Sequence, residues 1–125
     1  MIILLIGGES LSSVEKIRRS VLMTSANMPW AKTVDEALNY CTVSYAQMNT
    51  VVFLGQVLNE ETSGVRLLKT YELPKLVRER LSGLGREVRI FTSFPEADHN
   101  KLLLRGGCDE IVPLARLSSR LKKGD

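Results

Sequence analysis

Hydrophobic and polar positions follow two alternating patterns along this chain of 125 residues. Short runs that are apolar throughout, as in strands buried on both faces of a sheet, alternate with stretches whose apolar residues recur at helical spacing. The runs that we interpret as strands are Ile2 to Ile6, a short stretch near Trp30 and Ala31, Val51 to Leu54, Val88 to Thr92 and Ile111 to Leu114. This alternation predicts a parallel sheet with helices on both faces.

The stretch after the first strand predicts an amphipathic helix. Its apolar face is formed by Leu11, Val14, Ile17 and Val21. We expect Arg18 and Arg19 to face water on the opposite side. Ser12 and Glu15 have the spacing of a capping box, in which each side chain bonds the other residue's backbone N–H, so they predict where this helix begins.

Two further pairs with this spacing predict the starts of later helices. Thr33 and Glu36 precede the second helix, and Ser93 and Glu96 precede the helix after the fourth strand. In each pair the hydroxyl and the carboxylate would satisfy backbone N–H groups that have no partner inside the helix.

The region after the third strand is longer than a single strand and helix require. The polar stretch from Asn59 to Gly64 predicts a loop, followed by a helix from Val65 to Tyr71. Proline lacks a backbone N–H and clashes inside a helix, so Pro74 is expected to interrupt this helix. A second helical segment, Leu76 to Leu81, is expected after it.

Length and composition are those of an ordinary globular domain spanning residues 1–125. Hydrophobic residues make up 44% and charged residues 25% of the chain, which is too apolar for a disordered protein. The longest apolar run, Met1 to Ile6, is far shorter than the ~20 residues that cross a bilayer, and no basic stretch precedes it as in a secretory signal. We therefore expect a cytoplasmic protein with no membrane association.

Neither the cysteines nor the basic carboxyl end predicts a chemical site. Cys41 and Cys108 lie inside predicted elements, so we expect buried thiols rather than a disulfide or a zinc site. The formal charge of +3 is mild. Positive charge gathers in residues 116–125, which we interpret as a solvated tail or as a connector to another domain.

Five strand and helix units in this length predict a flavodoxin-like (βα)5 doubly wound parallel sheet with strand order 2-1-3-4-5. Several residues narrow this to a resemblance to the response-regulator receiver family, which covers nearly the whole chain. They are Ile3 to Glu9, Glu36 to Leu38, Thr92, and Gly107 to Ile111. In this fold the ligand site lies beyond the carboxyl ends of the first and third strands.

The resemblance implies a phosphorylation pocket that has lost its acids. In the family, two acids after the first strand and an aspartate after the third hold magnesium, and the aspartate accepts a phosphoryl group. Here Gly7 and Gly8 fall at the acid pair, and Gly55 or Gln56 falls at the acceptor. Glu9 alone is a poor substitute, because magnesium relies on several oxygen ligands. We expect no metal, no cofactor and no catalysis.

The other activation residues of the family are mostly replaced as well. The resemblance places the strand-five lysine at Leu114, the following proline at Ala115 and the switch aromatic at Ile111. Only the hydroxyl at Thr92 is retained, and β propensity with a local hydrogen bond explains it.

Three other features have simpler structural interpretations. Gly7 to Ser10, ahead of a helix, could favour an anion, but it lacks the nucleotide-binding patterns, so we interpret it as a tight turn. His99 is predicted on a helix surface without a nucleophile. A group of four arginines is interpreted as solvated charge, since no helix-turn-helix pattern or aromatic interleaving accompanies it. These are Arg78, Arg80, Arg86 and Arg89. Nucleic acid is therefore not an expected partner of this domain.

The leading hypothesis is a non-catalytic, phosphorylation-independent signalling or regulatory domain that acts by binding a protein partner or an attached effector domain. The resemblance also implies a possible homodimer face. Its residues are Leu103, Leu104, Ile111, Leu117 and Leu121. One alternative is binding of a small anion or nucleotide messenger in the vacated acidic pocket. The other is an unrelated flavodoxin-like enzyme, which predicts a cleft with convergent polar groups above the sheet.

Overall fold

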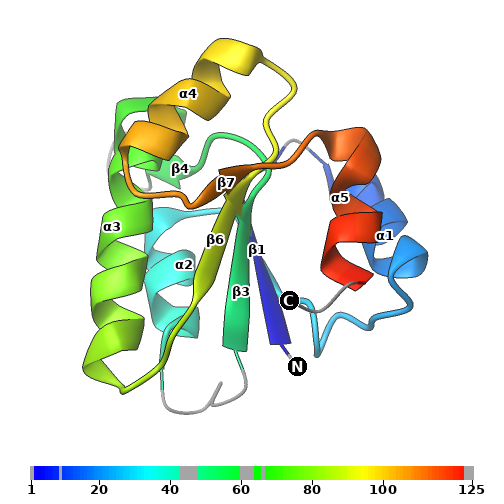
Figure 1. Cartoon of the computed structure of the whole chain (residues 1–125), viewed down its shortest axis with the longest axis horizontal. Helices are drawn as coiled ribbons and strands as arrows, with labels where there is room; N and C mark the ends of the chain where they lie inside the picture. Colours follow the sequence, from blue (N-terminus) through cyan, green and yellow to red (C-terminus); the bar gives the residue numbers. More distant parts are fainter. Residues whose placement is uncertain (1, 9, 43–47, 60–63, 66, 123–125) are drawn as a thin grey trace.

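A five-stranded parallel sheet with helices on both faces forms the centre of the computed structural model (Figure 1). The model describes residues 2–8, 10–42, 48–59, 64–65 and 67–122, and only the backbone of 58, 59, 64, 65 and 67–69. The strands are β1 (Ile2–Ile6), β2 (Trp30–Ala31), β3 (Met48–Phe53), β6 (Arg89–Thr92) and β7 (Glu110–Ile111). Their spatial order, β2-β1-β3-β6-β7, confirms the predicted order 2-1-3-4-5 and the flavodoxin-like fold.

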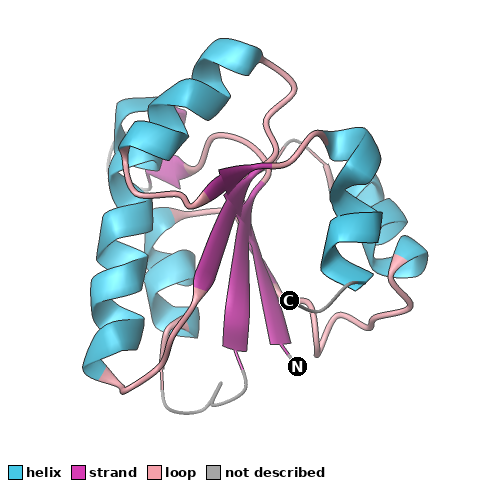
Figure 2. Ribbon diagram, viewed as in Figure 1, coloured by secondary structure: helices cyan, strands magenta, loops and turns pink. Residues whose placement is uncertain are grey.

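Two helical layers cover the sheet, as Figure 2 shows. Helices α1 (Leu11–Ser20) and α5 (Leu114–Lys122) lie on one face, and α2 (Val34–Tyr40), α3 (Leu67–Gly83) and α4 (Ala97–Arg105) lie on the other. Within the described residues, no helix combines the length and apolar character that a membrane span requires.

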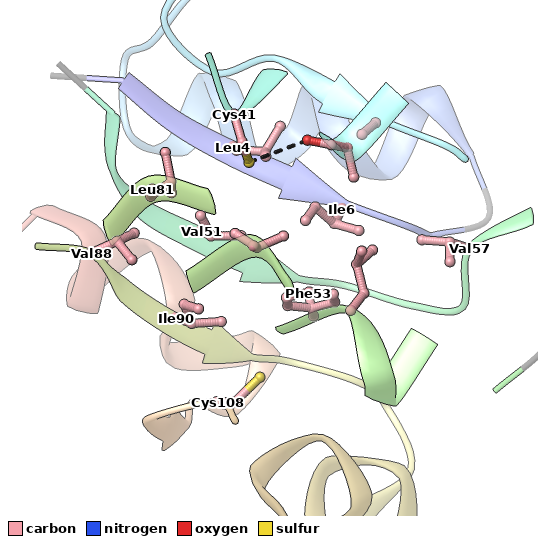
Figure 3. Packing of buried hydrophobic residues seen from close by; sticks show 14 of the residues in the cluster. Leu4, Ile6, Cys41, Val51, Phe53, Val57, Leu81, Val88, Ile90 and Cys108 are labelled. Atoms are coloured by element: carbon pink, nitrogen blue, oxygen red, sulfur yellow. Dashed lines mark hydrogen bonds between the residues drawn. The ribbon is translucent and has the colours of Figure 1, made fainter. Parts of the chain in front are cut away.

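Side chains alternate along the central strands between two hydrophobic cores, as the period of a strand requires. Ile3 and Leu5 of β1 pack toward α1 and α5, whereas Leu4 and Ile6 pack toward the three-helix layer. Figure 3 shows this second core, in which the labelled side chains from three neighbouring strands and α3 meet. Both faces of β1 are therefore buried, which explains why its sequence is apolar throughout.

The two cysteines are buried free thiols, as predicted. The Cys41 Sγ donates to the Ala37 carbonyl at 3.3 Å, the dashed line in Figure 3. Burial raises the pKa of Cys41 to about 11 and that of Cys108 to about 12. Neither thiol is therefore activated as a nucleophile.

Helix α1 differs from its prediction at both the cap and the polar face. Its N-cap is Ser10, whose hydroxyl accepts from the backbone N–H of Ser13 at 3.3 Å, so the Ser12 and Glu15 capping box is wrong. Arg18 is buried and not water-facing, because its Nε donates to the Met28 carbonyl at 2.9 Å. Glu15 instead pairs with the same guanidinium at 2.9 Å.

The other two capping predictions had opposite outcomes. The Thr33 hydroxyl accepts from Glu36 N at 3.0 Å and the Glu36 carboxylate accepts from Thr33 N at 3.2 Å, which confirms that capping box. At α4 the N-cap is Glu96 and makes no side-chain cap bond. Ser93 instead donates to the Val112 carbonyl, because the chain that follows β7 passes beside it.

Helix α3 runs without a break from Leu67 to Gly83, with Pro74 inside it, so the predicted interruption is wrong. Leu73, Val77 and Leu81 are all buried against the sheet, and this packing holds both halves of the helix in one line despite the missing N–H. Val65 is not helical either: β5 (Gly64–Val65) pairs with β4 (Leu58–Asn59) in a short antiparallel hairpin.

The fifth strand of the sheet ends earlier than predicted. Strand β7 is only Glu110–Ile111, and α5 already begins at Leu114. Residues 114–122 are helical, and Leu117 and Leu121 are buried in the core. The basic segment is therefore part of the packed domain up to Lys122, while residues 123–125 lie outside the described chain.

Candidate functional site

The carboxyl ends of β1 and β3 meet at one point of the sheet, which we call the crest. Leu5 and Ile6 of β1 lie opposite Val52 and Phe53 of β3. The backbone N–H of Leu54 extends this ladder by donating to the Ile6 carbonyl at 2.8 Å. The two loops that follow, beginning at Gly7 and Gly55, are thereby held side by side. Glu9 lies outside the described residues.

Backbone fills the space at the crest where the resemblance implies acids. A Cβ added to Gly7 would lie 2.0 Å from the Gly55 carbonyl oxygen, and one added to Gly55 would lie 2.8 Å from the Gly8 nitrogen. Gly7 also has a φ of +75°, and Gly8 has a φ of +111°, both unfavourable for a residue with a side chain. Gly7 and Gly55 therefore could not be exchanged for aspartate without moving the backbone.

Both candidate acceptor positions lie against the first loop, and Gly55 approaches it more closely. The nearest atoms to a Cβ at Gly55 are the N and Cα of Gly8, whereas Gln56 contributes its carbonyl oxygen at 3.0 Å from the Gly7 position. The closest approaches at Gly7 and Gly55 are therefore between main-chain atoms of the two loops.

Trp30, which sequence reasoning treated only as part of a weak strand, closes the crest from the side. Its indole Nε1 donates to the Gly7 carbonyl at 2.8 Å, and the Gly7 N–H donates to the Ala31 carbonyl at 2.8 Å. Lys32 lies 5.3 Å above the indole ring. The single tryptophan of the chain at a strand end was the available signal for this role.

Thr92 is buried in an internal hydrogen-bond network. Its hydroxyl donates to the Asn100 Oδ1 at 2.8 Å, and the same oxygen accepts from Phe94 N at 2.8 Å. The Asn100 Nδ2 donates to the Phe94 carbonyl at 2.9 Å. The local hydrogen bond predicted for Thr92 is therefore present, and it fixes the loop between β6 and α4. Asn100 was not singled out in the sequence.

Of the residues assigned to the family's activation parts, Ile111 lies on the fifth strand of the sheet and Leu114 lies beyond it. Leu114 is the first residue of α5 and is half exposed, so it does not stand on the fifth strand where the lysine was expected. Ile111 is on β7 and is partly exposed. Neither side chain supplies a charge or an aromatic ring to the crest.

The predicted dimer face divides into buried and exposed residues. Leu103, Leu117 and Leu121 are buried in the hydrophobic cores, because they lie on the inner sides of α4 and α5. They cannot contact another molecule in this fold. Leu104 and Ile111 are 41% and 37% exposed, so only these two of the five remain available.

The single histidine of the chain lies near the surface of α4. His99 is partly exposed on α4, where its Nδ1 lies 3.3 Å from the Glu96 carboxylate and its ring packs edge-on against Phe94. Among the residues that the structure describes, no group of three or more histidine, cysteine, aspartate or glutamate side chains could hold a metal ion.

Three of the four arginines predicted to be solvated donate to backbone carbonyls. Arg78 donates to the carbonyls of Val88 and Gly107 at 3.1 and 3.0 Å. Arg80 and Arg86 also donate to main-chain carbonyls, Arg80 to Leu38 at 3.3 Å and Arg86 to Thr42 at 3.0 Å; these two arginines link α3 and the chain after it to α2 and its end. Arg80 is exposed, as predicted, whereas Arg78 and Arg86 are partly buried. The sequence did not indicate these bonds, because the accepting carbonyls become neighbours of the arginines only in the tertiary fold.

The chain is similar to two solved structures. One is a crystal structure of a response regulator from Thermotoga maritima, at 15% sequence identity and a TM-score of 0.60, covering 98% of this chain and 96% of that chain. The other is a pilus assembly-related protein from Burkholderia pseudomallei, at 14% identity and a TM-score of 0.55, covering 98% of this chain and 88% of that chain. No protein-family model and no curated protein matches the sequence. Identity at this level shows the fold alone, and that fold is a flavodoxin-like one similar to a response regulator.

Proposed function

We propose that this chain is a receiver-like regulatory domain of the cytoplasm that binds a protein partner or an attached effector domain without phosphorylation, metal or catalysis. The observation that supports this most is the main-chain contact between Gly7 and Gly55. A phosphoryl acceptor needs a carboxylate and a nearby cation at this point, and the space for both is occupied by backbone.

The polar groups around the crest already form hydrogen bonds within the protein. The Trp30 indole, the Thr92 hydroxyl and the Asn100 amide each bond a group of the protein itself. Thr92 has no exposed surface, so a ligand could not reach its hydroxyl. This arrangement argues against a nucleotide messenger at Gly7, Gly8, Gln56 and Thr92, and against an enzyme whose polar groups converge there.

A binding surface of the proposed kind is available at the β7 edge of the sheet. Leu104 on α4, Ile111 on β7 and Leu114 on α5 are all large apolar side chains with at least a third of their surface exposed. Exposed apolar residues on neighbouring elements are typical of protein interfaces. A partner protein, an effector domain or a second copy of the chain could cover them.

The phosphorylation-independent part of the proposal is tested with acetyl phosphate or beryllium fluoride in the presence of magnesium. We expect the amide spectrum to remain unchanged, while a receiver domain that carries the acids responds in the same buffer. Saturable shifts centred on Gly55, Gln56 and Thr92 would overturn the proposal.

The docking surface is tested by charge substitution and sedimentation across a range of protein concentrations. If a second copy covers the surface, Leu104→Asp and Leu114→Asp should abolish self-association. The matched control is Leu22→Asp, because Leu22 is 89% exposed and follows the end of α1. Loss of self-association in the control as well would show that this edge is not the interface.

A further inference from the structure

The β7 edge of the sheet carries exposed apolar side chains among basic ones. Leu104 on α4 is 41% exposed and Ile111 on β7 is 37% exposed. In Figure 1, β7 lies between α4 and α5, so all three elements border this edge. We call the surface formed by Lys101, Leu104, Arg105, Ile111 and Arg116 the β7 face. The charges around its two apolar side chains indicate which partner fits it.

Two bases lie beside Leu104 on the outer side of α4. Lys101 comes three positions before Leu104 and four before Arg105, and both bases are exposed. Residues three or four apart are neighbours on a helix surface, so Lys101 borders both Leu104 and Arg105. Asn100 and Leu103 are buried and mark the inner side of the same helix.

A third base lies on the side of α5 that faces β7. The Arg120 guanidinium donates to both carboxylate oxygens of Glu110 on β7, each at 3.2 Å, and it lies 4.8 Å from the Phe91 ring centre. Arg116 is exposed and precedes Arg120 by four positions, which is about one turn of helix. Arg116 therefore lies on this same side of α5.

The acids on and next to β7 are already paired. Glu110 forms an ion pair with Arg120 at 3.2 Å, and Asp109 forms one with Arg78 at 2.8 Å. Their negative charge is therefore largely offset by these arginines and not by the three bases of the β7 face.

The β7 face consequently has an excess of positive charge. Within the part of the chain that the structure describes, its three bases form no ion pair. Asp98 is an exposed acid of α4, whereas Glu96 at the helix cap contacts His99 at 3.3 Å. Three bases against Asp98 leave a formal charge of +2. A partner of opposite charge is favoured at such a surface.

Building on the proposed docking function, we propose that the β7 face binds a protein partner through an acidic segment that carries apolar residues. Apolar side chains of the segment would cover Leu104 and Ile111, and its carboxylates would pair with the three bases. A second copy of the chain is disfavoured, because a two-fold contact places the same surface of both copies together and brings positive charge against positive charge.

The probe is a synthetic peptide with glutamates and leucines at helical spacing, titrated into the ¹⁵N-labelled chain at low ionic strength. We expect saturable amide shifts at Lys101, Leu104, Ile111 and Arg116. A matched peptide with glutamine at each glutamate should bind about tenfold more weakly, because it loses several exposed ion pairs. Added sodium chloride should reduce this difference in affinity.

Substitutions of the bases separate this surface from general attraction to a basic protein. Lys101→Gln, Arg105→Gln and Arg116→Gln should each weaken binding of the acidic peptide about threefold, as expected for an exposed ion pair. The control is Arg19→Gln, which removes the same charge from an exposed residue of α1, and it should leave the affinity unchanged. Equal weakening in all four variants would contradict the proposal.

The apolar part of the contact is tested by Leu104→Gln. It should weaken binding of both peptides about fivefold, because it removes apolar surface that the partner covers. The matched control is Leu76→Gln, since Leu76 is 47% exposed but lies on α3. Equal effects of the two variants would place the peptide elsewhere and contradict the proposal.

The outcomes distinguish this inference from the function on which it rests. Equal affinity of the two peptides for the β7 face would overturn the acidic partner and leave the docking function standing. Absence of saturable shifts with the acidic peptide would overturn the inference. So would binding of phosphatidylserine vesicles or of a DNA duplex at the β7 face when the acidic peptide does not bind. Failure of the proposed function is detected separately, by a response to beryllium fluoride with magnesium.

Discussion

The two ends of the sheet differ in how closely the backbone packs and in the charge of the residues there. At the crest, Gly7 and Gly55 bring two loops into main-chain contact and leave no space between them. At the opposite end, where the strands begin and which we call the base, a hollow of about 630 Å³ has Arg78, Arg86 and Arg89 among its lining residues. The same parallel strands thus end in a closed, uncharged junction on one side and begin beside an open, basic one on the other.

This difference is the basis of our proposal that the usual ligand site of the fold is closed in this chain. In open α/β sheets, ligands bind beyond the carboxyl ends of the strands because loops diverge there. Glycines without a Cβ allow the loops after β1 and β3 to close instead, and the Trp30 indole holds the Gly7 carbonyl in that position.

The largest effect is expected from Gly7→Ala, which tests whether the crest is as closely packed as described. The new Cβ would lie 2.0 Å from the Gly55 carbonyl oxygen at a positive φ, so we expect a loss of about 4 kcal/mol or more in the free energy of unfolding. Urea denaturation measures this loss.

The matched control for that substitution is Gly85→Ala. Gly85 has a nearly identical φ of +76°, but nothing lies within 4 Å of its added Cβ. Only backbone strain remains, so the expected loss is ~1 kcal/mol. Similar losses in the two variants would mean that the loops at the crest can move apart.

An intermediate effect is expected from alkaline pH. Burial raises the pKa of Cys41 to about 11 and of Cys108 to about 12, above the ordinary value of 9.0. A thiol in the unfolded chain ionises near pH 9, before the buried one does, so the stability that each buried thiol contributes is complete below pH 9. It is lost progressively from pH 9 up to about 11 for Cys41 and about 12 for Cys108. We expect the free energy of unfolding to fall by about 2 kcal/mol per thiol between pH 9 and 11.

Cysteine variants isolate this contribution from other groups that titrate at high pH. Cys41→Ala should remove the part of the decrease in unfolding free energy that comes from Cys41, and Cys108→Ala the part that comes from Cys108. Lysines and tyrosines also titrate in this range, but they contribute equally in the wild type and in both variants. An unchanged pH profile in both variants would show that the thiols near the base are accessible to water.

The smallest effect is expected from Arg78→Met, which tests whether the base is held by side chains. The variant loses bonds to two carbonyls and to Asp109. Because the guanidinium is half-buried, we expect a loss of about 1–2 kcal/mol in the free energy of unfolding. Arg105→Met, at an exposed position on α4, should change it by less than ~0.5 kcal/mol. Equal values would indicate that solvent already satisfies those carbonyls.

Much of the fold could be predicted because it depends on local patterns. The apolar runs identified all five strands of the main sheet, and their alternation with helices gave the order in which they pair. Thr33 and Glu36 lie three positions apart in sequence and need only each other, so the capping box was predictable. The burial of Cys41 and Cys108 followed from their places inside elements.

The predictions that failed concern side chains whose partners lie far away in sequence. Ser93 bonds the carbonyl of Val112 rather than capping its own helix. Arg18 bonds the Met28 carbonyl behind α1 instead of facing water. Pro74 remains within a helix because packing against the sheet outweighs the lost N–H. A pattern read along the chain contains no information about these distant groups.

The sequence by itself determined the order of strands and helices and the presence of glycines at the ends of the first and third strands, because both are local properties of residue type and spacing. The tertiary structure decided what those glycines do. Only when β1 and β3 lie side by side can the missing Cβ atoms become a main-chain contact between Gly7 and Gly55. It also decided that the scattered arginines meet around one hollow, because residues from α3 and the start of β6 become neighbours only after folding.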